Sequence, residues 1–127
     1  MSPADRFAQL PALLAADADV KRRGRWVGTD CRLDIGNEPF FLGIRDGTLA
    51  SFDRGPMLMR STVFTFRATD EAWTQYWKPI PEPGWHDLFA LTKRGAASMD
   101  GDLRPLMQNL QYFKDLLALP RSLRGAA

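Results

Sequence analysis

The sequence predicts an α+β domain with a single layer of five mostly antiparallel strands and helices packed on one face. The first observation is a change of period: apolar residues alternate in strand fashion through residues 25–68 and follow helical spacing from residue 69. The second is size, because 127 residues with 45% apolar content suffice for one core and are too few for two ordinary domains. Strands in the first half and helices in the second are typical of α+β proteins. We therefore expect a single domain over residues 1–127.

The N-terminal segment, residues 1–23, is predicted to be helical. Ser2, Pro3 and Asp5 have the order of a helix start, with a cap, a proline in the first turn and an early acidic residue. Pro11 is expected to kink this helix or to divide it into two short ones. Residues 17–23 are polar and are predicted to be a connection.

Four successive antiparallel strands are predicted in the first half, over residues 25–35, 39–45, 48–53 and 61–68. Along the first, alternation predicts a core face made of Val27, Thr29, Cys31, Leu33 and Ile35. Asp46-Gly47 is a strong two-residue hairpin signal. The intervening positions are charged, so we expect a solvated outer face on which Arg45 and Asp53 pair with Asp30, Arg32 and Asp34. The alternative is a surface that docks a partner protein.

The second half is predicted to hold two short helices, a strand and a long helix. Thr69 or Asp70 is expected to cap the first helix, whose buried face would carry Ala72, Trp73, Tyr76 and Trp77. Three prolines make residues 78–84 a stiff connector, and residues 85–93 form the next helix. The last strand is expected over residues 96–100.

The final helix is predicted to be long, with one buried face. Its apolar stripe is Leu103, Leu106, Met107, Leu110, Phe113 and Leu117. Asp102 is expected to cap it, Pro105 fits in its first turn, and Pro120 should end it. The tail, residues 121–127, is expected to fray.

The second half resembles the sterol carrier protein-2 family over residues 61–119. The similar features are the cap Thr69-Asp70-Glu71, the glycine Gly95 before a strand of small apolar residues, and the turn Gly101-Asp102 before the last helix. This resemblance implies a five-stranded sheet with helices on one side. It also implies an apolar tunnel for a lipid, fatty acyl, isoprenoid or sterol-like ligand, without catalytic residues.

The sequence offers apolar side chains that would suit such a tunnel. Aromatic and methionine side chains line adaptable apolar pockets, and the predicted helices are rich in both. Seven apolar side chains of these helices are the candidate wall residues: Trp73, Trp77, Trp85, Phe89, Met107, Leu110 and Phe113. The same residues would equally form an ordinary solid core, and sequence alone does not separate a hollow core from a filled one.

Other classes of function find little support. The net charge of +2 is small and the basic residues are dispersed, which argues against nucleic-acid binding. The one tight basic run, Lys21-Arg22-Arg23 with Arg25, is interpreted as a solvated connection. One histidine and one cysteine give no metal-ligand spacing, and no phosphate-binding glycine loop indicates a cofactor. A single cysteine and the absence of a signal peptide or membrane span predict a cytoplasmic protein.

Two further hypotheses remain beside the non-catalytic carrier. In one, the chain is an enzyme, or an accessory subunit of a partner enzyme, with His86 as acid or base beside Asp87. Adjacent helical residues do not face each other, so His86 is more simply a polar residue at a helix start. In the other, the chain is a ligand-free homodimer joined through a strand edge or the final helix.

Overall fold

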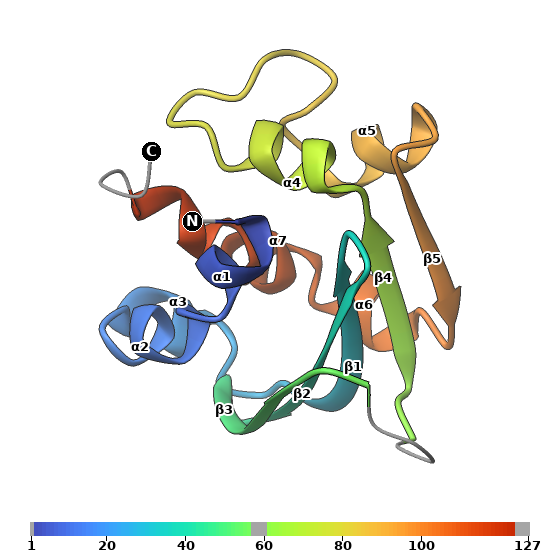
Figure 1. Ribbon diagram of the computed structural model, residues 1–127. Helices are drawn as coiled ribbons and strands as arrows, with labels where there is room; N and C mark the ends of the chain where they lie inside the picture. The colour runs from blue at the N-terminus through green and yellow to red at the C-terminus, as the bar shows by residue number, and fades with distance from the viewer. Residues whose placement is uncertain (1, 57–60, 124–127) are drawn as a thin grey trace.

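The computed structural model describes residues 2–56 and 61–123 and contains the predicted five-stranded sheet. The strands lie in the order β3-β2-β1-β4-β5. Their bounds are Gly28–Ile35 (β1), Glu38–Arg45 (β2), Thr48–Arg54 (β3), Phe64–Ala68 (β4) and Ala97–Gly101 (β5). The helices are Pro3–Phe7 (α1), Leu10–Ala15 (α2), Ala18–Arg23 (α3), Asp70–Tyr76 (α4), Leu88–Lys93 (α5), Arg104–Gln108 (α6) and Leu110–Ala118 (α7), with a 3-10 helix over Leu119–Ser122 (η1). Figure 1 shows α1, α2, α3 and α7 gathered on one side of the strands.

The first three strands form an antiparallel meander with two-residue turns. Asp46 and Gly47, with φ of 54° and 77°, both occupy the left-handed region that a tight hairpin turn of this kind requires. The hairpin predicted from Asp46-Gly47 is confirmed.

Strand β4 runs parallel to β1, so the prediction of four successive antiparallel strands is wrong at this strand. Cys31 of β1 stands opposite Phe64 of β4, and the register continues in parallel to Ile35 and Ala68. The chain leaves β3 at one edge and returns beyond β1, on the far side of the meander. Alternation of apolar residues reports which face of a strand is buried and carries no information about strand direction.

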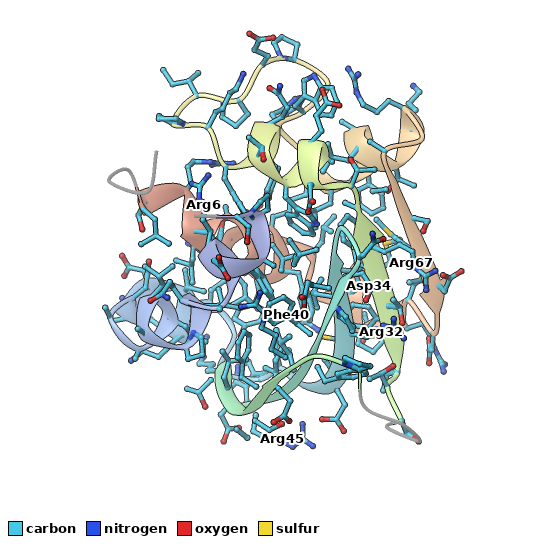
Figure 2. All side chains as sticks on the ribbon, viewed as in Figure 1. Arg6, Arg32, Asp34, Phe40, Arg45 and Arg67 are labelled. Atoms are coloured by element: carbon cyan, nitrogen blue, oxygen red, sulfur yellow. The ribbon has the colours of Figure 1, made fainter. Side chains whose placement is uncertain are left out.

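One face of the sheet and the inner sides of the helices enclose the core. All five residues predicted for the core face of the first strand are buried: Val27, Thr29, Cys31, Leu33 and Ile35. The opposite face carries ion pairs, as expected. Arg45 lies 3.2 Å from Asp30, and Asp34 lies between Arg32 and Arg67, at 2.7 and 3.9 Å (Figure 2).

We expect the Cys31 thiol of the folded protein to react roughly 100-fold more slowly with a disulfide reagent than in urea. The side chain has no exposed surface, and burial raises the pKa of the thiol, so the reactive thiolate is scarce. The release of a chromophore from the reagent, followed with and without urea, measures this difference. Equally fast reaction under both conditions would contradict the burial of Cys31.

The N-terminal segment contains one helix more than predicted. Ser2 caps α1 by accepting from the Asp5 N–H at 3.1 Å, and Pro11 stands in the first turn of α2, as expected. Residues 18–23, however, form α3, where a connection was predicted. Asp17 accepts from the Val20 N–H at 3.0 Å and Val20 is buried, so a cap and one apolar anchor suffice for this short helix.

The final helix is also not continuous, contrary to prediction. It divides at Asn109, whose φ of −127° and ψ of 36° lie outside the helical region. The Asn109 side-chain amide donates to the Pro105 carbonyl at 2.9 Å and so competes with the backbone for that acceptor. Leu103, rather than Asp102, is the N-cap residue of α6. In the predicted frayed tail, Arg121 and Ser122 belong to η1.

Candidate functional site

Helix α4 carries two tryptophans into the middle of the core. Thr69 caps the helix by accepting from the Ala72 N–H at 3.1 Å, which sets the face that turns inward. Trp73 and Trp77 are 0% and 1% exposed, and their ring centroids are 5.3 Å apart. Each indole N–H has a buried backbone acceptor: Asp34 O at 3.1 Å for Trp73, and Leu117 O at 2.8 Å for Trp77. Both rings are therefore held in place by packing and by hydrogen bonds.

A residue that sequence reasoning did not single out fills the space beside these rings. Phe7 of α1 is completely buried and stacks on Trp77, with centroids 6.4 Å apart and an interplanar angle of 12°. It also meets Phe40 edge to face at 4.9 Å. The place of Phe7 in the apolar stripe of the first helix was a signal that it is buried, but its partner lies seventy residues along the chain. This half of the core is packed with aromatic rings.

Phe113 of α7 is likewise a core residue. It is 1% exposed and meets Phe64 edge to face at 5.5 Å. Its neighbour Tyr112 donates its hydroxyl to the Gly47 carbonyl at 2.9 Å and so ties α7 to the β2–β3 turn. Three candidate wall residues, Trp73, Trp77 and Phe113, thus have protein partners on the sheet or on neighbouring helices.

The candidate wall residues of the α6–α7 region are more open. Met107 is 46% exposed, and Leu110 is only partly buried. Leu103, also partly buried, stands four residues before Met107 at the start of α6, and Leu110 is the first residue of α7. We call Leu103, Met107 and Leu110 the apolar rim. It spans the helix break at Asn109, and Leu106 on the core side of α6 is 1% exposed.

The α5 region holds the remaining candidate wall residues, Trp85 and Phe89, which are both partly buried. The Arg94 guanidinium lies 4.0 Å from the Trp85 ring centroid and donates to the Gly84 carbonyl at 3.1 Å. This cation–π contact covers one face of the indole. Trp85 packs against the core but is only partly buried, unlike Trp73 and Trp77. Helix α5 begins at Leu88, three residues later than predicted, so Trp85 lies in the segment before it.

His86 lies in a polar hollow and not among the apolar residues. It is exposed, and its Nδ1 accepts from the Gly84 N–H at 3.3 Å. The neighbouring Asp87 is engaged by Lys114, whose Nζ is 3.0 Å from Asp87 Oδ1. These side chains border a hollow of about 340 Å³ that is also lined by Tyr76, Gln111, Asp115, Ala118 and Arg121. Asp87 is therefore held by a lysine and does not orient His86.

Two larger hollows lie at other places on the surface. One, of about 440 Å³, is at the end of the sheet, where β4, β5 and the β1–β2 turn meet, and Arg67, Thr69 and Asp70 are among its lining residues. The other, of about 500 Å³, lies between α3 and the end of α7. Neither hollow is lined by a candidate wall residue. Over residues 2–56 and 61–123, no cluster of three or more His, Cys, Asp or Glu side chains has the arrangement of a metal site, and no helix could span a bilayer.

Comparisons with known proteins find the same architecture in solved structures. No protein-family model and no curated protein sequence matches the chain. A crystal structure of sterol carrier protein 2 superposes with a TM-score of 0.64 at 17% identity, over 96% of each chain. A ubiquinone synthesis protein, UbiJ-SCP2, gives 0.59 at 19% identity, over 92% of this chain and 88% of the other. Palmitated SCP2L2 from Aedes aegypti gives 0.55 at 15% identity, over 92% and 95%.

These similarities concern the fold, because all three identities are low. Each superposition covers at least 92% of this chain. The resemblance inferred from Thr69-Asp70-Glu71, Gly95 and Gly101-Asp102 is confirmed at this level.

Proposed function

We propose that this chain, which has the sterol carrier protein-2 fold, is a non-catalytic carrier for a small hydrophobic molecule with a fatty acyl or isoprenoid chain. The observation that carries the proposal is the apolar rim. Solved structures of this fold include a palmitated protein. In this chain Met107 is 46% exposed, two residues before the break at Asn109. Leu103 and Leu110, its neighbours in the sequence, are partly buried. Exposed apolar surface of this kind is typical of sites that bind something apolar.

The way the core is packed favours a ligand site under α6 over one beside α4. Trp73 and Trp77 use their indole N–H groups on backbone carbonyls, so displacing them would leave polar atoms unpaired in the core. In α6 the buried residue is Leu106, and exposing that side chain costs about 1.5–3 kcal/mol. Burial of an alkyl chain contributes about 0.8 kcal/mol per methylene, so roughly four buried methylenes offset that cost. A long acyl or isoprenoid chain has several times that number.

We expect freshly purified protein, in native mass spectrometry, to take up palmitate or an isoprenoid alcohol at one molecule per chain. Leu110→Trp should lower the affinity at least about 10-fold, because a bulkier side chain at the apolar rim occupies the space that the ligand needs. Ile80→Trp is the matched control: Ile80 is 86% exposed on the proline-rich connector, so the same bulky residue should leave affinity unchanged there.

The stability of the Leu110→Trp variant adds a second readout. If the region under α6 opens, the free energy of unfolding should change by less than about 1 kcal/mol, whereas a solid core would lose about 1–3 kcal/mol through overpacking. The carrier proposal fails if neither ligand class binds, or if Leu110→Trp binds as tightly as the unaltered chain.

A further inference from the structure

The turn between α3 and β1 presents a large aromatic side chain to solvent. Trp26 is 85% exposed, in contrast to the buried Trp73 and Trp77. The Arg25 guanidinium lies 5.7 Å from its ring centroid. An indole that is mostly exposed gives the folded chain little packing energy, and its ring is accessible to a binding partner.

The turn that carries Trp26 is firmly built. The Val27 N–H donates to the Gly24 carbonyl at 2.8 Å, and Val27 is buried on the inner side. Gly24 is packed so closely on Tyr112 that an added Cβ would lie 2.2 Å from the ring. The Gly47 N–H of the neighbouring hairpin donates to the Val27 carbonyl at 3.3 Å. Trp26 therefore projects from a turn that is anchored on both sides.

Guanidinium groups surround a small hollow beside this turn. The hollow has a volume of about 270 Å³ and is lined by Arg22, Arg23, Arg25 and Asp19. Asp19 pairs with Arg22 at 2.5 Å, and Arg23 pairs with Asp115 of α7. Among the residues that the structure describes, Arg25 has no acidic partner. Three arginines face one lining carboxylate, so the hollow suits an anionic oxygen group such as a phosphodiester.

We propose that Trp26 and the Arg22–Arg25 cluster form a docking surface for membranes that contain anionic phospholipid. Tryptophan is enriched at membrane–water interfaces because its ring is apolar and its N–H is polar. Adjacent arginines bind lipid phosphates and are attracted by the negative surface potential. Nucleic acid is a weaker fit, since it requires a basic stripe with several stacking aromatics, whereas this surface holds one indole in a chain of net charge +2. This inference does not rest on the carrier proposal.

Vesicle flotation of the full chain tests this inference. Phosphatidylcholine vesicles with about one third phosphatidylserine should bind the protein, and the tryptophan emission should shift to the blue as Trp26 leaves water; pure phosphatidylcholine should bind at least about fivefold more weakly. Trp26→Ala should abolish the blue shift and weaken binding. Arg22→Gln with Arg25→Gln should weaken binding by about fivefold per charge removed, the equivalent of ~1 kcal/mol each.

Two controls keep this result interpretable. Ile80→Ala removes another highly exposed apolar side chain, at 86% exposure, and should bind vesicles like the unaltered chain. Trp26→Ala should keep its thermal unfolding midpoint, because an exposed side chain contributes little to stability. The proposal is overturned if Trp26→Ala binds vesicles normally, if neutral and anionic vesicles bind equally, or if single-stranded DNA binds more tightly than anionic vesicles.

Discussion

Replacing Trp77 by Ala is expected to lower the free energy of unfolding by about 3–5 kcal/mol. The side chain is 1% exposed, stacks on Phe7 and lies 5.2 Å from the Arg6 guanidinium. Its removal opens a void between α1, α4 and the end of α7. It also deprives the Leu117 carbonyl of its donor, at a further cost in the range of about 1–3 kcal/mol if no other donor reaches it. The total free energy of unfolding of a small domain is about 5–15 kcal/mol, so the variant should be only marginally folded.

Urea denaturation followed by circular dichroism measures this loss, with Trp26→Ala as the matched control. The chemical change is the same, but Trp26 is 85% exposed, so its loss should cost within about 0.5 kcal/mol. Trp77→Phe retains most of the ring volume and should cost about 1–3 kcal/mol, which keeps the test informative if the alanine variant does not fold. Equal stability of the two alanine variants would mean that Trp77 has no packed surroundings.

Replacing Gly47 by Ala is expected to cost about 2–5 kcal/mol, the second large effect. Gly47 has φ of 77°, which disfavours any residue with a side chain. An added Cβ would also lie 2.6 Å from the Lys21 carbonyl oxygen and 2.7 Å from the Gly24 carbonyl carbon, both of them backbone atoms of the α3 end. Backbone atoms of a packed junction move only if the hairpin, α3 or the Tyr112 hydroxyl contact shifts.

Gly95→Ala separates the cost of the left-handed backbone conformation from the cost of the close contacts with α3. Gly95 has a similar φ of 81°, but an added Cβ would have no atom within 4 Å. This control should therefore lose only about 1 kcal/mol, from backbone conformation alone. Thermal unfolding should show a midpoint lowered by roughly 10 °C for Gly47→Ala and by a few degrees for Gly95→Ala. Matching midpoints would show that the close approach of Gly47 to α3 has no energetic consequence.

Local patterns were sufficient to predict much of the fold. Alternation along residues 25–68 located the strands, because each residue reports its own burial through its polarity. Ser2 and Thr69 marked helix starts because a side chain that bonds a backbone N–H three residues on is a local event. Asp46-Gly47 specified a turn for the same reason. The class of fold followed from the order of these elements.

Features that depend on distant partners were missed. The direction of β4 is decided by where the chain returns to the sheet, and nothing in residues 64–68 records it. The break at Asn109 depends on a side-chain amide that competes for the Pro105 carbonyl, within a stripe that otherwise reads as one helix. Helix α3 owes its stability to tertiary contacts, since six residues alone do not form a stable helix.

The burial of several candidate wall residues was predictable from the sequence, but the shape of the space around them was not. The helical stripe correctly identified apolar side chains that face inward, among them Trp73 and Phe113. Whether such a stripe bounds a hollow depends on what fills the space opposite, and beside Trp77 that is Phe7, from the other end of the chain. Composition and spacing within one helix do not contain that information.

The parallel pairing of β1 with β4 has a consequence for the order in which the chain acquires structure. The meander β1-β2-β3 needs only two-residue turns, so it closes through short loops, whereas β1 meets β4 across more than thirty residues. Strand β1 lies at the centre of the finished sheet but at an open edge of the nascent meander. Until Phe64–Ala68 pairs with it, β1 has an edge of unpaired backbone N–H and C=O groups beside the apolar side chains of Cys31, Leu33 and Ile35. The chain from β4 onward, which carries the apolar rim, thus also covers the open edge of the meander.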